Sequence, residues 1–419
     1  MKPMQWFYEC SDCKARYPLK PGLYLCPACA ERLGRKTQVE AAARPLTGVL
    51  ECVWEGEFSG DADEIPLPVP GNYFPELPVG HTPLWEPERL RTESGFANLY
   101  LKDDSCEPSG SFKDRASWLV AAFARQHGIK EIALASTGNA ASSMACIGAA
   151  AGLDITVFLP KAAPQAKRVQ VLQYGAKLKE VDGTYDTALE ESLAFSAATG
   201  VLSRNTAYNP LTIEGKKTVA FEMVRDLAWA VQHHGVQSSH SAAASASAAD
   251  SPAAEFIAPD HVFVPVGDGV IIAGVYKGFE DLVKLGRIAK MPVIWACQAE
   301  GSSAIARALE SGHFKDVVAS NTLADSISVD VPSNGSYVLK KLQKYGGRAA
   351  VVSDREILLA QRELASRSGL FAEPSSSAAW AAFCKVKELL PHDARVVVML
   401  TGSGLKDVAG ALKGLALEE

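Results

Sequence analysis

The sequence predicts an α/β protein with mainly parallel sheets. Short apolar segments rich in β-branched residues alternate with helical patterns from residue 99 onward, and several of these segments end in glycine-rich turns. Short buried strands that alternate with helices are typical of parallel sheets covered by helices on both faces. A cluster of cysteines near the N-terminus stands apart from this pattern and predicts a separate small extension.

The expected elements follow one another in strand–helix order. Each predicted strand is short and apolar, and each predicted helix carries apolar residues at helical spacing. Strands are expected at residues 98–102, 131–136, 154–159, 177–181, 261–265, 291–298 and 395–400, and helices at 114–126, 140–151 and 274–285. Residues 31–80 contain six prolines, which predict a loop-rich connector rather than one helix.

The composition excludes several classes of protein. Of the 419 residues, 47% are hydrophobic and 21% are charged, and the net charge is −6. This charge disfavours non-specific binding to nucleic acid or to anionic membranes, which requires clustered positive charge. No apolar run reaches the roughly 18–20 residues of a membrane span. Because Glu9 and Asp12 precede any apolar region, we expect no secretory signal and a cytoplasmic location.

One segment has low complexity. Fourteen of the twenty residues 235–254 are Ser or Ala. Such a segment cannot bury enough apolar area to offset its ordering entropy. We therefore expect a flexible surface insertion here.

Four cysteines have the spacing of a metal site. They form two Cys-x-x-Cys pairs separated by residues 14–25, namely Cys10 with Cys13 and Cys26 with Cys29. Each pair can present two thiolates to one tetrahedral ion, and ligation by protein alone is typical of structural Zn²⁺. The spacing predicts a zinc-ribbon-like site. The alternatives are four reduced core cysteines without metal, a redox pair, and a ribbon that binds nucleic acid or protein.

Three glycine-rich turns and one lysine indicate a phosphate-bearing cofactor. The turns Ser136–Ala140, Pro265–Val270 and Thr401–Leu405 each follow a predicted strand, where backbone N–H groups can bind an anion. Lys113 begins a predicted helix, and partial burial there would favour the uncharged amine that condenses with an aldehyde. Alone, Lys113 would be interpreted as an exposed lysine. Together these features predict one cofactor in an α/β crevice.

The order of the motifs between about residues 80 and 407 resembles a known family. The segments that carry the resemblance are Gly80–Leu84, Pro108–Arg115, Ser136–Ala140, Asn209–Thr218, Gln298–Gly301, Glu373–Ala378 and Thr401–Asp407. They are similar to the fold type II (tryptophan synthase β) pyridoxal-phosphate enzymes, and within these to the threonine synthases. The resemblance implies two domains, each with an open, twisted, mainly parallel sheet, that hold pyridoxal 5′-phosphate between them.

The resemblance also implies a domain organisation. Residues 1–50 would form the zinc-ribbon-like extension and connector. Residues 51–115 and 226–419 would form the large cofactor-binding domain, interrupted by the insertion at 235–254. Residues 116–225 would form a small mobile domain that closes over the substrate, and the chain would form a homodimer.

Roles for individual residues follow from the resemblance. Lys113 would be the catalytic residue and would hold the cofactor covalently, Asn139 would bind its 3′-hydroxyl, and Thr401 would face its pyridine nitrogen. The remaining cofactor contacts would come from Phe112, Gly267, Asp268, Gly269, Val270 and Ile271. The substrate carboxylate would bind near Ser136, Thr137 and Gly138.

Two positions depart from the family pattern. Asp268 stands in a phosphate loop where Asn is expected, and Ser403 stands where the family often has His. An aspartate beside a phosphate is explained if its side chain turns away or caps the following helix, and this is the placement we expect for Asp268.

A phosphorylated substrate needs a cationic clamp. Residues 182–200 contain no Lys or Arg. The remaining substrate-binding candidates are Lys167, Arg168 and Arg204, with Asn205 and Thr206 as polar neighbours. Lys167 and Arg168 also fit solvated helix charges.

The expected activity is that of a pyridoxal-phosphate-dependent carbon–oxygen lyase of the threonine synthase type, which eliminates phosphate from O-phosphohomoserine and adds water. The alternative is a β-elimination or β-replacement enzyme, similar to serine or threonine ammonia-lyases or to cysteate synthase. A third possibility is a catalytically idle binding protein, against which intact Lys113, Asn139 and Thr401 argue. The expected partners are a small amino acid and a second copy of the chain, and neither nucleic acid nor a membrane.

Overall fold

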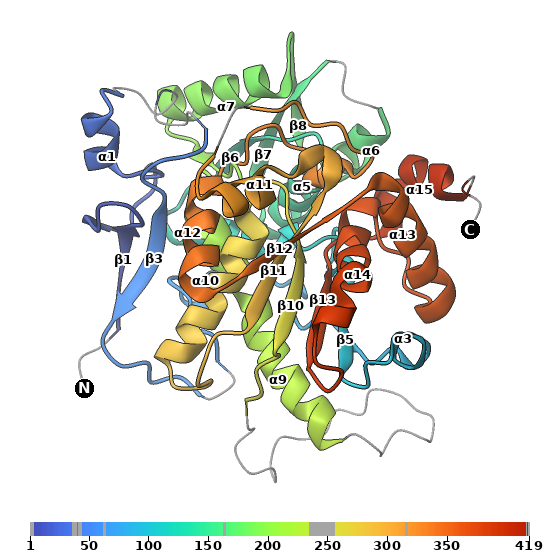
Figure 1. The fold of residues 1–419 in the computed structure, drawn as a ribbon. Helices are drawn as coiled ribbons and strands as arrows, with labels where there is room; N and C mark the ends of the chain where they lie inside the picture. Colours follow the sequence, from blue (N-terminus) through green and yellow to red (C-terminus); the bar gives the residue numbers. More distant parts are fainter. Residues whose placement is uncertain are drawn as a thin grey trace.

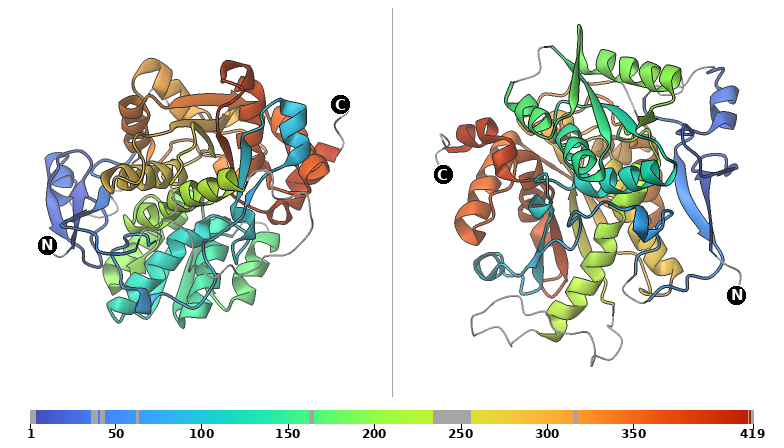
Figure 2. Two further views of the ribbon diagram at one scale, coloured as in Figure 1. Left: turned by 90° about the horizontal axis from the view of Figure 1, so that it is seen from below. Right: turned by 180° about the vertical axis from the view of Figure 1, so that it is seen from behind.

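The framework consists of two sheets with helices packed around them (Figures 1 and 2). The computed structural model describes residues 4–415 and 417, apart from 36–39, 41–43, 62–63, 162–164, 234–255 and 315–316. The Ser/Ala-rich segment predicted at 235–254 lies outside the described residues.

The larger sheet has six strands in the order β12-β11-β10-β13-β5-β4. All neighbouring strands are parallel except β4 and β5. The strands are β4 (Leu84–Trp85), β5 (Leu99–Asp103), β10 (His261–Pro265), β11 (Val293–Ala299), β12 (Arg348–Val352) and β13 (Val396–Leu400). Every residue of β5 and of β13 is buried, which is the pattern of a parallel sheet covered on both faces.

The smaller sheet has four parallel strands in the order β8-β7-β6-β9. They are β6 (Glu131–Ala135), β7 (Asp154–Pro160), β8 (Lys177–Val181) and β9 (Leu202–Ser203). The α/β class and the mainly parallel pairing therefore agree with the sequence-based expectation.

Helices cover both sheets and connect their strands. Those before β10 are α1 (Pro27–Arg32), α3 (Glu88–Ser94), α4 (Lys113–Gln126), α5 (Asn139–Ala151), α6 (Gln165–Gln173), α7 (Tyr185–Thr199), α8 (Leu211–Lys216) and α9 (Thr218–Gln232). Those after it are α10 (Val270–Lys284), α11 (Ala304–Ser311), α12 (Gly335–Tyr345), α13 (Asp354–Ser368), α14 (Pro374–Val386) and α15 (Val408–Leu415). Short 3₁₀ turns include η2 (Asp104–Cys106) and η4 (Asp325–Ile327). No helix among the described residues has both the length and the apolar character needed to cross a bilayer.

Most element boundaries lie within two residues of their predicted positions, but α10 begins earlier than predicted. The helix expected from residue 274 starts at Val270. Gly269, with φ of +88°, is its N-cap, so the glycine loop leads directly into the first helical turn. The prediction was wrong because it treated the loop and the helix as separate segments.

A small antiparallel sheet, β2-β1-β3, forms the N-terminal extension. Its strands are β1 (Gln5–Cys10), β2 (Arg16–Pro18) and β3 (Leu50–Glu55), and it lies beside α10 and α12 (Figure 1). Glu51 on β3 accepts hydrogen bonds from the Tyr337 hydroxyl at 2.5 Å and from Lys341 Nζ at 3.0 Å, both on α12. Strand β3 pairs with β1 from Leu50 to Glu55. The predicted boundary between the extension and the large domain, at residue 50, therefore falls at the start of β3.

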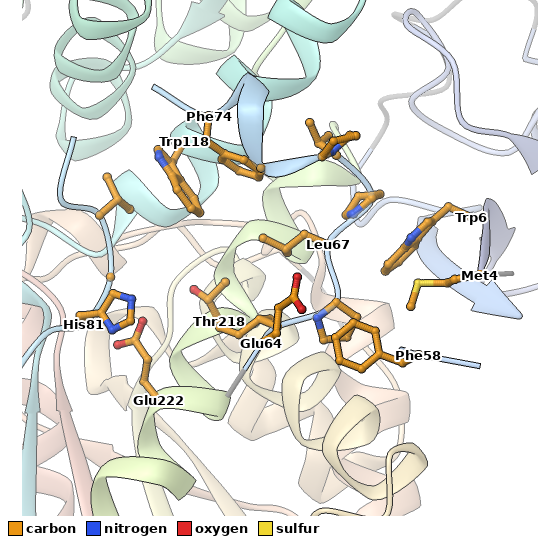
Figure 3. A pocket seen from close by; sticks show the side chains of 18 of the residues that line it. Met4, Trp6, Phe58, Glu64, Leu67, Phe74, His81, Trp118, Thr218 and Glu222 are labelled. Carbon is orange, nitrogen blue, oxygen red and sulfur yellow. The ribbon is translucent and has the colours of Figure 1, made fainter. Parts of the chain in front are cut away.

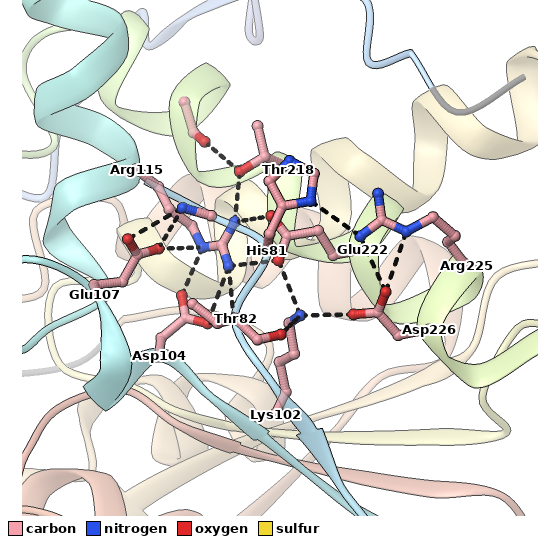
Figure 4. Close-up of polar contacts among 12 residues, drawn as sticks. His81, Thr82, Lys102, Asp104, Glu107, Arg115, Thr218, Glu222, Arg225 and Asp226 are labelled. Carbon is pink, nitrogen blue, oxygen red and sulfur yellow. Dashed lines mark hydrogen bonds and ion pairs between the residues drawn. The ribbon is translucent and has the colours of Figure 1, made fainter. Parts of the chain in front are cut away.

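A buried charge network joins three parts of the chain (Figure 4). The Arg115 guanidinium on α4 donates to Asp104 in η2 at 2.6 Å and to Glu222 on α9 at 2.5 Å. Lys102 on β5 pairs with Glu222 at 2.9 Å. Arg115 follows Lys113 closely in sequence, so this network fixes the first turn of α4 against the larger sheet.

Candidate active site

Segments far apart in the sequence converge on one cavity at the carboxyl ends of β10 and β13. Its lining includes Lys113, Asn139, residues 265–272, Ser326, Ile327, Glu373, Ser375 and Thr401. Ligands of open α/β sheets bind at this position, outside the carboxyl ends of the strands. The structure thus brings together the lysine, the Asn139 amide, the phosphate loop and Thr401.

Lys113 is the first residue of α4 and is held against the end of β13. The backbone N–H of Phe112 donates to the Thr401 carbonyl at 3.0 Å, and Ser111 forms a bridge with Gly402. Burial lowers the pKa of Lys113, and Arg204 lowers it further, whereas Asp268 and Glu373 raise it. The lowered pKa favours the uncharged amine, which is the nucleophilic form of lysine. Phe112 is fully buried and is not among the residues that line the cavity.

The loop from Gly267 to Ile271 forms a cradle at the N-terminus of α10. A Cβ on Gly267 would lie 2.8 Å from the Cα of Ile327, and one on Gly269 would lie 2.9 Å from Val338. Backbone N–H groups at the start of a 15-residue helix favour a phosphate. The side-chain amide of Asn334, also beside Gly269, is buried and has no hydrogen-bond partner. The glycine cradle and this free amide fit the phosphate of pyridoxal phosphate.

Asp268 does not turn away from this cavity. Asp268 is one of the residues that line the cavity, and its charge acts on Lys113 and on Lys216. The expectation that Asp268 caps α10 was wrong, because Gly269 is the N-cap and no side chain caps the helix.

Asn139 is oriented by a carboxylate that sequence analysis had not assigned to the site. Its Nδ2 atom donates to both carboxylate oxygens of Glu373 at 3.1 Å and lies 3.4 Å from the Ser326 hydroxyl. Ser326 in turn is held by Ser375, whose hydroxyl accepts its backbone N–H at 2.9 Å. Burial raises the pKa of Glu373. The Glu373–Ala378 motif was visible in the sequence, but only the fold shows that its first residue reaches Asn139.

The turn after β6 carries the predicted carboxylate-binding residues. The Ser136 hydroxyl accepts hydrogen bonds from the backbone N–H groups of Gly138 and Ala141, both at 3.2 Å. Thr137, between Ser136 and Gly138 in the sequence, is partly exposed. These three residues adjoin Asn139, the first residue of α5, so the turn lies at the edge of the cavity rather than in its lining.

The segment after β9 contains one buried cation, Arg204, and two polar residues that support the local structure, Asn205 and Thr206. Arg204 is fully buried and donates to the Ser117 hydroxyl, to the Thr206 hydroxyl and to the carbonyl of Lys113. The amide of Asn205 is used within the protein, because its oxygen accepts from Ala135 N–H at 2.8 Å and its nitrogen donates to Ser192 and Ser203. This placement favours a positioning role for Asn205.

The other two candidate cations lie elsewhere. Arg168 pairs with Glu180 and donates to the carbonyl oxygens of residues 160 and 161. The side chain of Lys167 lies outside the described part of the chain. Lys216, which sequence analysis had not singled out, is buried close enough to Lys113 for the charge of Lys113 to lower its pKa.

The four N-terminal cysteines converge as their spacing predicts. Their sulfur atoms all lie within 4.8 Å of one another, with Cys10 and Cys29 at 3.7 Å and Cys13 and Cys26 at 3.5 Å. Tetrahedral Zn²⁺ with Zn–S bonds of about 2.3 Å would separate its sulfur ligands by about 3.8 Å. A Cβ on Gly48 would lie 2.9 Å from the Cβ of Cys26, so this glycine allows β3 to approach the cluster.

A separate cavity of about 620 Å³ lies between the N-terminal extension, the proline-rich connector and helices α4 and α9 (Figure 3). Aromatic side chains form much of its wall, including Trp6, Phe58, Phe74 and Trp118. It shares no lining residue with the cavity that contains Lys113.

Comparison with known proteins identifies the family of the chain. The family model described as pyridoxal-phosphate dependent enzyme matches residues 75–402. A threonine synthase of Methanosarcina acetivorans is 30% identical, covering 95% of this chain and 92% of the relative. The threonine synthase of Methanocaldococcus jannaschii is 33% identical over 80% of this chain and 77% of its own.

Solved structures show the same fold at lower identity. The processed form of tomato (Solanum lycopersicum) threonine deaminase isoform 2 has a TM-score of 0.63 and 21% identity, covering 80% of this chain and 84% of its own. Maize serine racemase has a TM-score of 0.63 and 20% identity, covering 81% of this chain and 92% of its own. On the family match and the relatives at 30% identity or more, the chain belongs to the pyridoxal-phosphate-dependent enzymes and, within them, to the threonine synthases.

Proposed function

We propose that the chain converts O-phosphohomoserine to threonine by eliminating phosphate and adding water. The observation that carries the proposal is the convergence of Lys113, the Asn139–Glu373 pair, the glycine cradle and Thr401 on one cavity. Pyridoxal phosphate, when bound, supplies the electron sink for a carbanion. The chain determines which bond then breaks.

The residues would act as follows. Lys113 binds the cofactor and moves protons at the α and β carbons of the substrate, which its lowered pKa favours. The loop from Gly267 to Ile271 binds the cofactor phosphate through its N–H groups. Asn139, oriented by Glu373, holds the 3′-hydroxyl, and the neutral Thr401 hydroxyl faces the pyridine nitrogen. Ser136, Thr137 and Gly138 bind the substrate carboxylate.

The domain organisation supports the same reaction. We propose that the four-stranded unit within residues 116–225 moves towards the larger sheet when substrate binds at Ser136–Gly138. Such closure excludes water while the reaction proceeds and opens to release product. A homodimer and a cytoplasmic location complete the proposal, and the free cysteines of the described chain fit a reducing compartment.

We further propose that Cys10, Cys13, Cys26 and Cys29 hold a structural Zn²⁺ ion. Four sulfur ligands leave no open coordination position, so the ion would stabilise the extension without entering the chemistry. The cluster lies in the N-terminal extension, at the end of β1 and the start of α1, and none of its cysteines lines the cavity that contains Lys113.

The test is a product assay on purified, cofactor-loaded protein. With O-phosphohomoserine, the proposal predicts equal amounts of inorganic phosphate and threonine. With serine or threonine as substrate, it predicts little keto acid. Keto acid formed without phosphate release would assign the chain to the alternative β-elimination enzymes.

A further inference from the structure

The side chain of Lys406 connects the two sheets of the protein. Lys406 is the last residue of η6 (Gly404–Lys406), a 3₁₀ turn that follows β13 of the larger sheet. Its Nζ atom donates to the Ser109 carbonyl at 3.0 Å, to the Ser142 hydroxyl at 2.8 Å and to the side-chain oxygen of Gln170 at 2.7 Å. An ammonium group has three N–H donors, so each donor of Lys406 has its own acceptor.

Two of these acceptors belong to the smaller sheet and the third belongs to the turn before Lys113. Ser142 lies in α5, between β6 and β7, and its hydroxyl also donates to the carbonyl of Asn139 at 3.3 Å. Gln170 lies in α6, between β7 and β8, and its Nε2 atom donates to the same Ser109 carbonyl at 3.1 Å. The three acceptors therefore link the segments that carry Lys113 and Asn139.

The backbone on which Lys406 stands is held in place. The backbone N–H of Ser403 donates to the Gly110 carbonyl at 3.0 Å, and that of Gly404 donates to the Phe371 carbonyl at 2.7 Å. Ser403 also forms a bridge with Ala372. Because η6 is fixed at its backbone, the Lys406 side chain is the part that reaches across to α5 and α6.

The acceptors of Lys406 are neutral, which sets it apart from the cations that hold the core. Lys102 pairs with Glu222 at 2.9 Å, and Lys217 pairs with Asp281 at 2.8 Å. Lys406 is half-buried and forms no ion pair with a carboxylate among the residues that the structure describes. Water can replace neutral oxygens as partners of an ammonium at a half-exposed position. The contact is therefore suited to form and break repeatedly.

We propose that Lys406 is a positioning residue that holds α5 and α6 against η6 when the cleft is closed and releases them when it opens. We call the Lys406 ammonium with its acceptors on Ser109, Ser142 and Gln170 the Lys406 clamp. The clamp keeps the segments of Lys113 and Asn139 in register with the turn after β13. The inference rests on the movement of the four-stranded unit in the proposed function, and it names the contact that regulates this movement.

Three variants of the cofactor-loaded protein test the clamp. Lys406→Met keeps the length of the side chain and removes its charge and its donors. Gln170→Glu replaces a neutral acceptor with a carboxylate, which should hold the ammonium more tightly. Lys413→Met, at an exposed position of α15, is the matched control.

The first readout is amide hydrogen exchange of α5 in the absence of substrate, which measures how often this part of the protein opens. Exchange should be at least about tenfold faster in Lys406→Met, because hydrogen bonds of a charged group are lost. It should be slower in Gln170→Glu and unchanged in Lys413→Met. The double variant should behave like Lys406→Met, since its carboxylate has no cation to hold.

The second readout is the kinetics of O-phosphohomoserine conversion. Lys406→Met should raise KM about tenfold and leave kcat within about twofold of the wild type, because saturating substrate closes the cleft without the clamp. Gln170→Glu should lower KM and kcat together, because opening and product release become slower. A residue with a merely structural role would instead lower kcat and Tm in both variants, and this pattern would contradict the clamp.

Two other results would overturn the proposal. One is wild-type exchange of α5 together with wild-type KM in Lys406→Met. The other is exchange in Gln170→Glu that is as fast as in the wild type or faster. The second result decides the question even if Lys406→Met does not fold, because Gln170→Glu keeps the ammonium.

The outcomes also distinguish this inference from the proposed function. If exchange of α5 changes in opposite directions in the two variants but O-phosphohomoserine yields no threonine, the clamp stands and the proposed reaction fails. If threonine forms but Lys406→Met and Gln170→Glu exchange like the wild type, the reaction stands and this inference fails.

Discussion

Burial sets the charge states of the residues around the cavity. It lowers the pKa of Lys113 and raises the pKa of Glu373, so both groups are shifted towards their neutral forms. A neutral amine can attack an aldehyde, which is the reaction that Lys113 needs. Three predictions concern these residues.

Replacing Lys113 should stop the reaction. In Lys113→Ala the cofactor loses its covalent attachment and the substrate loses its proton carrier, so kcat should fall by about a thousandfold or more. Turnover of O-phosphohomoserine and the visible absorbance of the reconstituted protein measure the two losses. A variant that keeps a large part of wild-type turnover would remove Lys113 from the mechanism.

The lowered pKa of Lys113 has a consequence for cofactor loading. Because only the uncharged amine attacks the aldehyde, the rate at which apoprotein takes up pyridoxal phosphate should rise with pH and level off once Lys113 is deprotonated. The midpoint of this rise should lie below the ordinary lysine value of 10.5. A midpoint at or above that value would show that the lysine is not buried as described.

Glu373 should act by orienting Asn139. In Glu373→Gln one oxygen that accepts from Asn139 becomes a donor, which should reduce kcat about tenfold through the loss of one of the two hydrogen bonds that orient Asn139. The exposed Glu388→Gln is the control. Equal activity of the two variants would show that Asn139 needs no support from Glu373.

At the scale of whole elements, local patterns predicted the α/β class and most strand and helix positions. Buried, β-branched segments such as β10 and β13 can be recognised from the sequence alone, because a strand covered on both faces is apolar along most of its length. The cysteine spacing likewise predicted the cluster that the fold forms. Glu373 could not be assigned to the site from the sequence, because its contact with Asn139 depends on how the start of α14 packs against the start of α5 rather than on neighbouring residues.

The N-terminal extension gives an element-scale prediction. Cys10→Ser should reduce the zinc content from about one ion per chain and lower the Tm, because a structural metal contributes directly to folding. Activity per bound cofactor should be unchanged, since none of these cysteines lines the cavity that contains Lys113. The exposed Cys106→Ser is the control. Wild-type zinc content in Cys10→Ser would refute ligation by four cysteines.

At the scale of the whole molecule, the network around Arg115 links the connector, α4, the larger sheet and α9 (Figure 4). Its guanidinium is fully buried among Asp104, Glu107 and Glu222. Because Arg115 lies in the first turn of α4, the network also sets the position of Lys113 relative to the strand ends. Stability and site geometry therefore depend on the same residues.

Removing Arg115 should be costly. Arg115→Met leaves the buried Asp104 and Glu107 without their cation and takes one of two cations from Glu222, which still pairs with Lys102, and such changes cost about 3–5 kcal/mol. Arg395→Met, which breaks a half-exposed pair with Asp260, should cost about 0–1 kcal/mol. Urea unfolding followed by tryptophan fluorescence compares the two. Similar losses in both variants would contradict the buried network.

The most direct test of the account is the fate of O-phosphohomoserine in the presence of the cofactor-loaded protein. The account predicts that inorganic phosphate and threonine appear together in equal amounts, and that Lys113→Ala produces neither. Keto acid from serine or threonine, without phosphate release from O-phosphohomoserine, would contradict it.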